Sequence, residues 1–229
     1  MSQGNVRTIR VMSSPALAWQ TSLLDSAAET ELDRSFSDLT RIELDATSWV
    51  DHAPGWLGGS DELFAELLGR IDWRQRSRHM YDARVAEPRL TASWRADTGT
   101  VLRPPVLERM REALSDRYEV ELDSVGLNLY RDGRDSVAWH RDRIAKEIVE
   151  PIVAIVSVGE PRRFLLRPCE GEGRRRARTF LLGRGDLLVT GGACQREWEH
   201  SVPKVAVAGP RISITFRHGM DPSAYERKS

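Results

Sequence analysis

A histidine and an aspartate two residues apart give the first sign of chemistry in this chain. His140 and Asp142 follow a short segment, 136–139, that is expected to be a strand. Side chains at positions i and i+2 of a strand lie on one face, so both groups should point the same way. Together they supply two of the three ligands of a 2-His-1-carboxylate iron site. A His-x-Asp triplet is common, however, and a surface His–Asp pair is the ordinary alternative.

An iron site of this kind needs a second histidine. His52 lies in an expected loop, His79 in an arginine-rich stretch, and His218 after the last expected strand. His200, in the segment Trp198–Pro203 between two expected strands, is the best candidate by position. The alternative for His200 is a loop histidine at the end of a strand.

The segment 211–217 alternates strictly between apolar and polar residues. One face carries Ile212, Ile214 and Phe216, and the other carries Arg211, Ser213, Thr215 and Arg217. A solvated polar face would explain this pattern. Two arginines on one face could instead hold a dicarboxylate, because a guanidinium pairs with a carboxylate through two parallel hydrogen bonds. Asn128 and Tyr130, also at i and i+2, would add two donors.

The elements that must position these residues are mostly strands. We expect strands at 125–131, 136–139, 152–158, 164–167, 179–182, 186–190 and 211–217. A helix is expected at 60–69, with Ser60 as N-cap and Gly69 as its end, and another at 104–117, opened by two prolines. Short strands with glycine turns and few helices are typical of a double-sheet roll packed against helices. We therefore predict an α+β chain with a mainly β core, in which both helices cover one sheet.

Composition excludes several classes of protein. With 229 residues, 40% hydrophobic and 30% charged, the chain is neither disordered nor membrane-embedded. The longest nearly apolar run, 151–159, is far shorter than the ~18 residues needed to span a bilayer. Cys169 and Cys194 fit no metal or disulfide pattern, and no apolar stretch opens the chain, so we expect a cytoplasmic protein, by default a monomer.

Arginine dominates the basic residues, at 31 of 34, although the net charge is zero. A bias in the base composition of the genome would explain this excess. A phosphate-contacting surface is the functional alternative, since arginine matches phosphate geometry. Candidates for such contacts are Arg74, Arg76, Arg78, Arg167 and the run 174–176.

The order of these motifs resembles the AlkB family of iron(II)/2-oxoglutarate dioxygenases, the oxidative nucleic-acid demethylases, and most closely the animal homologues. The similarity extends over roughly residues 65–218. It rests on Ile71–Arg74, Pro88–Ala92, Asn128–Arg131, Asp135–Asp142, Trp198–Lys204 and Pro210–Arg217. The last of these is close to the family's R-x-N-x-T-F-R signature.

The resemblance implies a role for each of these residues. His140, Asp142 and His200 would be the catalytic iron ligands. Asn128, Tyr130, Arg211, Ser213 and Arg217 would hold 2-oxoglutarate. Tyr81 and Trp94 would stack on a flipped base, and Arg167 would contact the substrate. A double-stranded β-helix (jelly roll) domain would span 60–229, include a substrate-gripping lid at about 71–100, and follow an N-terminal extension, 1–59, that could form a helical cap.

The implied function is oxidative demethylation of N-alkylated bases in DNA or RNA. It would need Fe(II), 2-oxoglutarate and dioxygen, and would release formaldehyde, succinate and carbon dioxide.

Three departures affect the substrate side: Ser213 replaces an asparagine, Arg143 and Ile144 stand where the family carries an acid, and only Trp94 supplies a lid aromatic after Ala92. The alternatives are a 2-oxoglutarate-dependent hydroxylase acting on a protein or small molecule, and a non-catalytic binding module of the same fold.

Overall fold

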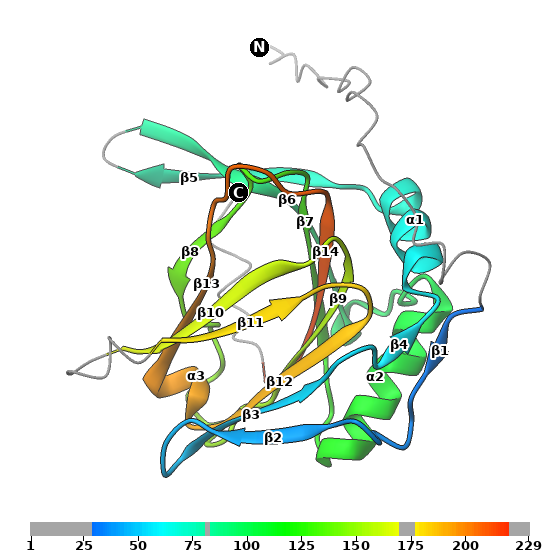
Figure 1. Cartoon of the computed structure of the whole chain (residues 1–229), viewed down its shortest axis with the longest axis vertical. Helices are drawn as coiled ribbons and strands as arrows, with labels where there is room; N and C mark the ends of the chain where they lie inside the picture. Colours follow the sequence, from blue (N-terminus) through cyan, green and yellow to red (C-terminus); the bar gives the residue numbers. More distant parts are fainter. Residues whose placement is uncertain (1–28, 81–82, 170–176, 220–229) are drawn as a thin grey trace, which may run out of the picture.

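Two antiparallel sheets face each other and form the body of the molecule (Figure 1). The computed structural model describes residues 29–80, 83–169 and 177–219, without the side chains of 78–80 and 83–85. The mainly β fold with a few helices confirms the predicted fold class. Within the described residues, none of the helices is long and apolar enough to cross a membrane.

The larger sheet has eight strands, and the smaller facing sheet has four. In spatial order, the larger contains β2 (Thr40–Glu43), β3 (Ser48–Ala53), β12 (Asp186–Gly192), β9 (Val153–Gly159), β14 (Arg211–Arg217), β7 (Ser124–Tyr130), β6 (Ala83–Arg95) and β5 (Arg74–Met80). The smaller contains β11 (Arg178–Leu182), β10 (Arg162–Pro168), β13 (Trp198–Val202) and β8 (Val137–His140). A two-stranded pair, β1 (Glu31–Leu32) and β4 (Leu57–Gly58), lies apart from both.

Two helices cover the outer side of the larger sheet, as predicted (Figure 1). They are α1 (Ser60–Arg70) and α2 (Pro105–Tyr118), each within one residue of the expected bounds. The expected cap of α1 was wrong by one position: Gly59, with a left-handed φ of 63°, is the N-cap, and Ser60 is already helical and buried. The helix also runs past Gly69, because one glycine costs a helix only about 1 kcal/mol relative to alanine. A 3₁₀ turn (Ala96–Thr98) and the short α3 (Cys194–Glu197) complete the helices of the described residues.

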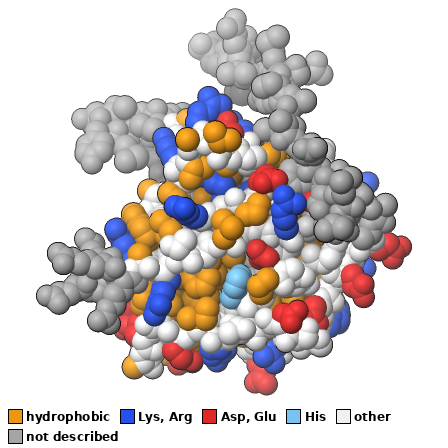
Figure 2. Space-filling view, viewed as in Figure 1, with side chains coloured by type: hydrophobic (Ala, Val, Ile, Leu, Met, Phe, Trp, Pro, Cys, Tyr) orange, Lys and Arg blue, Asp and Glu red, His pale blue; other side chains and the backbone are white. Residues whose placement is uncertain are grey.

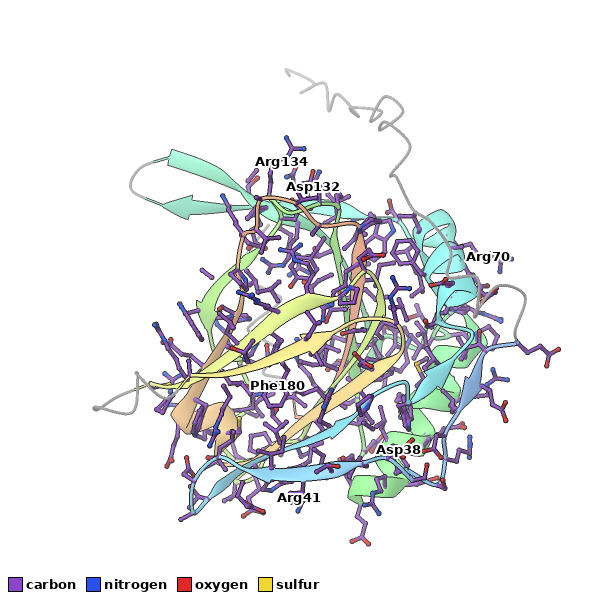
Figure 3. All side chains as sticks on the ribbon, in the orientation of Figure 1. Asp38, Arg41, Arg70, Asp132, Arg134 and Phe180 are labelled. Carbon is purple, nitrogen blue, oxygen red and sulfur yellow. The ribbon has the colours of Figure 1, made fainter. Side chains whose placement is uncertain are left out.

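The core consists of two apolar clusters, one on each side of the larger sheet. One lies between the sheet and the helices and contains Ile212, Ile214 and Phe216 of β14. The other lies between the two sheets and contains Tyr130, Phe164 and Phe180. In Figure 3, Phe180 lies among the side chains that fill the roll, whereas Arg70 at the end of α1 points outward. The alternation of β14 therefore places its four polar residues inside the roll, and not on a solvated face.

Part of the expected N-terminal extension, 1–59, is joined to the larger sheet. Strand β3 pairs with β12 over six residue pairs, so it belongs to the larger sheet. The buried Asp51 carboxylate accepts two hydrogen bonds from Arg41 of β2 and one from the Tyr118 hydroxyl of α2. Residues 29–59 contain no helix, and so the expected helical cap is absent from the described part of this segment.

Several strands were not predicted from the sequence: β1 to β4, the hairpin of β5 and β6, and β13. Strand β13 contains His200, which was expected between two strands. The hairpin formed by β5 and β6 occupies most of the expected lid, 71–100, and extends beyond the body of the roll (Figure 1). Runs of polar residues, such as Arg74–His79 in β5 and Glu199–Ser201 in β13, hid these strands from a search for apolar alternation.

Candidate active site

Three potential metal ligands converge inside the roll. His140 ends β8, Asp142 follows two residues later, and His200 lies in β13, directly opposite His140 in the strand register. One ligand atom from each residue lies within 4.8 Å of the others, and the two imidazole centroids are 4.2 Å apart. The antiparallel pairing of β8 with β13 thus joins residues that are 60 positions apart in the sequence.

The surroundings of the two histidines favour the neutral imidazole, which is the form that binds a metal. Nδ1 of His140 lies 2.9 Å from the Ala138 carbonyl oxygen and donates to it, which leaves the Nε2 lone pair for a metal. The ring of His200 is buried and stacks on Phe164 at 5.2 Å between centroids. Burial lowers the pKa of His140, and burial together with the neighbouring His140 lowers the pKa of His200 to about 3. Both rings are therefore neutral at physiological pH, as a metal ligand must be.

The Asp142 carboxylate is held in its charged form by Arg217. Its Oδ2 accepts a hydrogen bond from Nε of Arg217 at 2.9 Å, and its Oδ1 one from Nη2 at 3.3 Å. Burial alone would raise the pKa of Asp142, but Arg217 and the two imidazoles outweigh it and hold the pKa well below its usual range. A Cβ at Gly126 would lie 2.7 Å from Nη1 of Arg217, so the glycine gives the guanidinium room to lie across β7.

Arg211 and Arg217 are the first and last residues of β14 and lie on the same face of it. Arg211 is buried with unsatisfied hydrogen-bond donors. It is only 1% exposed, and Nη2 donates to the Ser157 hydroxyl at 2.6 Å. Nε and Nη1 are buried and have no hydrogen-bond partner. Burial lowers the pKa of Arg211 to about 10, so the residue remains charged at neutral pH. A buried cation with unused donors is costly unless an anion completes it, so the slot fits a carboxylate ligand.

The other co-substrate candidates line the same face. Tyr130 lies opposite Arg211 in the register, with its ring 5.4 Å from the guanidinium carbon. Asn128 lies opposite Ser213, whose buried hydroxyl is 3.5 Å from that of Thr215. All five residues that we expected to hold 2-oxoglutarate are therefore on the inward face of β7 and β14.

Two neighbours of this slot were missed in the sequence. Ser157 of β9 lies opposite Ser213 and bonds to Arg211. Arg89 of β6 donates from Nε to Oδ1 of Asn128 at 2.9 Å, and its Nη2 is 3.2 Å from Glu87, which is buried. Arg89 falls within the Pro88–Ala92 motif, so its place there was a usable signal. The Asn128 amide is thereby oriented, with its NH₂ group left to donate.

The three expected substrate residues do not join this group. Tyr81 lies outside the described residues. Trp94 lies opposite Val125, on the sheet face that packs against the helices, and its indole N–H donates to the Thr100 carbonyl. Arg167 belongs to the outward face of the smaller sheet, where it pairs with Glu199 and stacks on Trp139 at 4.0 Å. The period of two explains both placements, because Trp94 and Arg167 are out of phase with the inward residues Ser93 and Leu166.

A cleft of about 760 Å³ opens at the edge of the larger sheet, beside β6. Arg74 is the first residue of β5 and pairs with Thr91, so no described strand flanks β6 from Ala92 onward on this side. Trp94, Arg74, Arg76 and Arg103 are among the lining residues. Arg74 is paired with Asp72, whereas Arg76 and Arg103 form no ion pair with a described residue. On the face shown in Figure 2, basic and acidic side chains are interspersed, and several basic ones lie over the upper part.

Comparison with known proteins agrees with this geometry. The 2OG-Fe(II) oxygenase superfamily matches residues 59–217. The bovine alpha-ketoglutarate-dependent dioxygenase alkB homolog 3 is 33% identical over 207 residues, covering 82% of this chain and 69% of the relative. The human DNA oxidative demethylase ALKBH2 is 32% identical over 180 residues, covering 69% of this chain and 68% of the relative.

Among solved structures, that of OsALKBH1 shares the fold, with a TM-score of 0.53 at 16% identity over 78% of this chain and 99% of that one. Two imidazoles and a carboxylate suit Fe(II) and leave coordination positions open for a co-substrate and dioxygen. The unsatisfied donors of Arg211 suit the second carboxylate of 2-oxoglutarate. The sequence matches, the fold and the donor set together place this chain in the 2OG-Fe(II) oxygenase superfamily, among the AlkB-type 2-oxoglutarate-dependent dioxygenases.

Proposed function

We propose that this dioxygenase demethylates N-alkylated bases in DNA or RNA. One molecule each of dioxygen and 2-oxoglutarate would oxidise the N-methyl group, and the products would be the unmodified base, formaldehyde, succinate and carbon dioxide. The observation that carries the oxidative part is the three-ligand cluster facing the same interior as the buried, incompletely paired Arg211. The relatives named AlkB homolog 3 and ALKBH2 support a nucleic-acid substrate.

In this proposal, His140, Asp142 and His200 hold Fe(II), which supplies the activation of dioxygen. Arg217 keeps the Asp142 carboxylate charged and oriented through its two hydrogen bonds. Hydrogen bonding of Nδ1 to Ala138 keeps the His140 ring turned toward the metal. These contacts orient the ligands before any substrate binds, so little reorganisation is needed during the reaction.

Arg211 binds the carboxylate of 2-oxoglutarate that lies far from the metal. Its Nε and Nη1, which have no hydrogen-bond partner among the described residues, would be available to this carboxylate, while Ser157 holds Nη2 in place. Tyr130 contributes its hydroxyl, and Asn128, oriented by Arg89, contributes its amide N–H. Ser213, shorter than the family's asparagine, leaves a hydroxyl on the same face. Apolar neighbours such as Phe164 and Leu166 exclude water from the slot.

The cleft beside β6 supports a nucleic-acid partner. Arg76 and Arg103 offer guanidinium groups that no described acid neutralises, and Trp94 offers an aromatic side chain in the same cleft. Phosphates bind well to arginine forks, and bases stack on aromatic rings. We propose that a strand flanking the target base runs through this cleft, while the base itself is flipped toward the metal.

One assay tests the proposal. The Fe(II)-loaded protein is mixed with 2-oxoglutarate and single-stranded oligonucleotides carrying 1-methyladenine or 3-methylcytosine, as DNA and as RNA. We expect formaldehyde and succinate in equal amounts, and neither from Asp142→Ala, which lacks a metal ligand. Succinate without formaldehyde from any of these oligonucleotides would contradict the demethylase proposal.

A hydroxylase acting on a protein or small molecule is the second candidate. It is favoured by Arg143 and Ile144, which stand where the family carries an acid, and by the burial of Ile144 in the inter-sheet core. Ile144 cannot accept a hydrogen bond from the amino group of a methylated base. Succinate production stimulated by a peptide or a small molecule, but not by oligonucleotides, would establish this second function.

A further inference from the structure

The short helix α3 contacts both chain segments that carry the metal ligands. It lies between β12 and β13 and ends at Glu197, directly before the strand that contains His200 (Figure 1). Asp142, by contrast, lies in the connection between β8 and β9, where no residue of 141–152 belongs to a strand or helix. A ligand on such a connection needs support from elsewhere, because a loop alone does not hold a side chain to the tolerance of a metal site.

Gln195 of α3 supports the backbone of Asp142. Its side chain is buried, and Oε1 accepts a hydrogen bond from the Asp142 backbone N–H at 3.3 Å. Its Nε2 donates to the Thr190 hydroxyl of β12 at 2.9 Å. That hydroxyl in turn donates to the Val153 carbonyl of β9 at 3.4 Å. The amide is thus held at both ends, so its oxygen must point at Asp142.

These contacts close a ring around Asp142. Val153 lies opposite Arg217 in the sheet register, and Arg217 holds the Asp142 carboxylate. This ring of contacts starts at the Asp142 carboxylate, runs through β14, β9, β12 and α3, and returns to Asp142 at its backbone N–H. The side chain of Asp142 is fixed from one side and its main chain from the other, which leaves the carboxylate little freedom.

Arg196 fixes the chain that follows Asp142. Its Nη2 donates to the carbonyls of Ala145 and Ile148 at 2.7 and 2.8 Å, and its Nη1 to that of Ile144 at 3.4 Å. In return, Nη1 of Arg141 donates to the Arg196 carbonyl at 2.6 Å. No carboxylate takes part in these bonds, so the guanidinium serves to order backbone and not to neutralise an acid.

We propose that Gln195 and Arg196 are positioning residues that set the metal affinity of the site by holding Asp142 in register with His140 and His200. The inference rests on the proposed role of these three residues as ligands. Outer partners of metal ligands typically change metal affinity 10–100-fold when they are removed. We expect an effect of this size from loss of the Gln195 amide, and a similar one from loss of the Arg196 guanidinium.

The experiment measures metal binding without turnover. Mn(II) titrations of the metal-free protein, followed by electron paramagnetic resonance, give the Kd, and the visible spectrum of the Co(II) form reports the ligand geometry. Gln195→Met keeps the size of the side chain but removes both hydrogen bonds. We expect its Kd to rise 10–100-fold and its Co(II) bands to shift. Arg196→Met should behave similarly, and Arg196→Lys should recover part of the affinity.

Thr190 provides a pair of variants that leaves Gln195 in place. Thr190→Val removes the hydroxyl that orients the amide and should weaken Mn(II) binding by a smaller factor than Gln195→Met does. Thr190→Ser restores the hydroxyl and should restore the affinity. Gln75→Met is the matched control, because that amide donates to the Glu87 carbonyl in the hairpin. Its Kd should equal that of the native protein.

The outcomes separate the two proposals. If the native protein binds Mn(II) but the Gln195, Arg196 and Thr190 variants bind it equally well and only their Tm falls, α3 has a purely structural role and this inference is wrong. If the native protein binds no Mn(II), or binds it unchanged in Asp142→Ala, the proposed metal site itself fails. Should Gln195→Met not fold, Thr190→Val and Thr190→Ser still decide the matter.

Discussion

Arg211 is a cation that the fold buries with less hydrogen bonding than it can make. Removing a charged group from water costs several kcal/mol, and a hydroxyl from Ser157 compensates only in part. The arrangement is reasonable for a residue whose partner is a bound anion. Asp142 illustrates the opposite case, since its charge is fully compensated by Arg217 before any metal arrives.

Arg211→Met should therefore weaken 2-oxoglutarate binding far more than it weakens metal binding. Truncating one partner of a buried charge pair costs about 2–5 kcal/mol, which corresponds to roughly 30-fold or more in affinity. The measurement is the KM for 2-oxoglutarate from succinate production, together with the Kd for Mn(II). Ser93→Ala, on β6 of the same sheet and separated from β14 by β7, is a suitable control. An unchanged KM would mean that the co-substrate binds elsewhere.

At the scale of elements, β14 explains why the site can exist inside a roll. Its apolar residues pack against the helices while its polar residues face the smaller sheet, and all of them except the half-buried Arg217 are buried. Paired with β7 and β9, it places Arg211 beside Tyr130 and Ser157 and leaves Arg217 within reach of Asp142. The strand register thus sets the spacing between the anion slot and the metal ligands.

The contribution of the N-terminal strands to the larger sheet can be tested by deletion. Since β3 pairs with β12 and supplies Asp51 to Tyr118 and Arg41, a variant lacking residues 1–59 should lose this edge of the sheet and expose buried surface. We expect it to aggregate, or to melt well below the full chain, in calorimetry. A variant lacking only residues 1–28 is the control, because the described sheets begin at β1. Equal Tm values for the full chain and the 1–59 deletion would contradict the role of β3.

At the scale of the whole molecule, a neutral chain presents a local concentration of arginine beside the hairpin. Zero net charge argues against general attraction to nucleic acids, but unpaired guanidiniums in one cleft can still bind a phosphate backbone. The cleft lies next to β6, which also carries Arg89 and so touches the co-substrate slot. One strand therefore links the proposed nucleic-acid contact with the proposed chemistry.

Charge reversal tests this contact. Arg76→Glu and Arg103→Glu should each weaken binding of single-stranded oligonucleotides and lower the slope of log K against log salt by about 0.7, the contribution of one phosphate contact. Fluorescence anisotropy at several salt concentrations gives both quantities. Arg163→Glu is the matched control, because Arg163 is exposed on the outward face of β10 and has no ion-pair partner among described residues. Equal effects of all three substitutions would argue against a specific path through the cleft.

Acid should destabilise the metal-free protein. Burial lowers the pKa of His52, His140 and His218, and brings that of His200 to about 3, below the ordinary 6.5. Below about pH 6.5 the unfolded chain takes up protons that the folded chain resists, so the free energy of unfolding falls by up to ~1.4 kcal/mol per pH unit for each such histidine. Protonation of His218 also removes the acceptor for the Ile152 N–H.

The Tm of the metal-free protein, measured between pH 7.5 and 5, should therefore fall steadily as the pH is lowered. Asp142 adds to the effect only at lower pH, because its lowered pKa lies below that of a free aspartate. Bound Mn(II) should raise the Tm more at pH 7.5 than at pH 5, since protons compete for the imidazoles. A Tm that is constant or rises toward pH 5 would show that the histidines are not buried as neutral groups.

The sequence by itself determined the elements with a strong local period. Helices α1 and α2, strand β14 and the spacing of His140 and Asp142 follow from alternation and helical periodicity, which are properties of neighbouring residues. The motif order was sufficient to identify the family and to name the eight residues that line the proposed site.

Only the tertiary structure decided which distant residues meet. Pairing across 60 positions puts His200 opposite His140, and no local pattern encodes that register. The same holds for Arg89 on Asn128, Ser157 on Arg211 and Gln195 on Asp142, where each pair joins different strands or loops. Trp94 and Arg167 turn away from the proposed site because the face on which a strand residue lies depends on the register of the whole sheet.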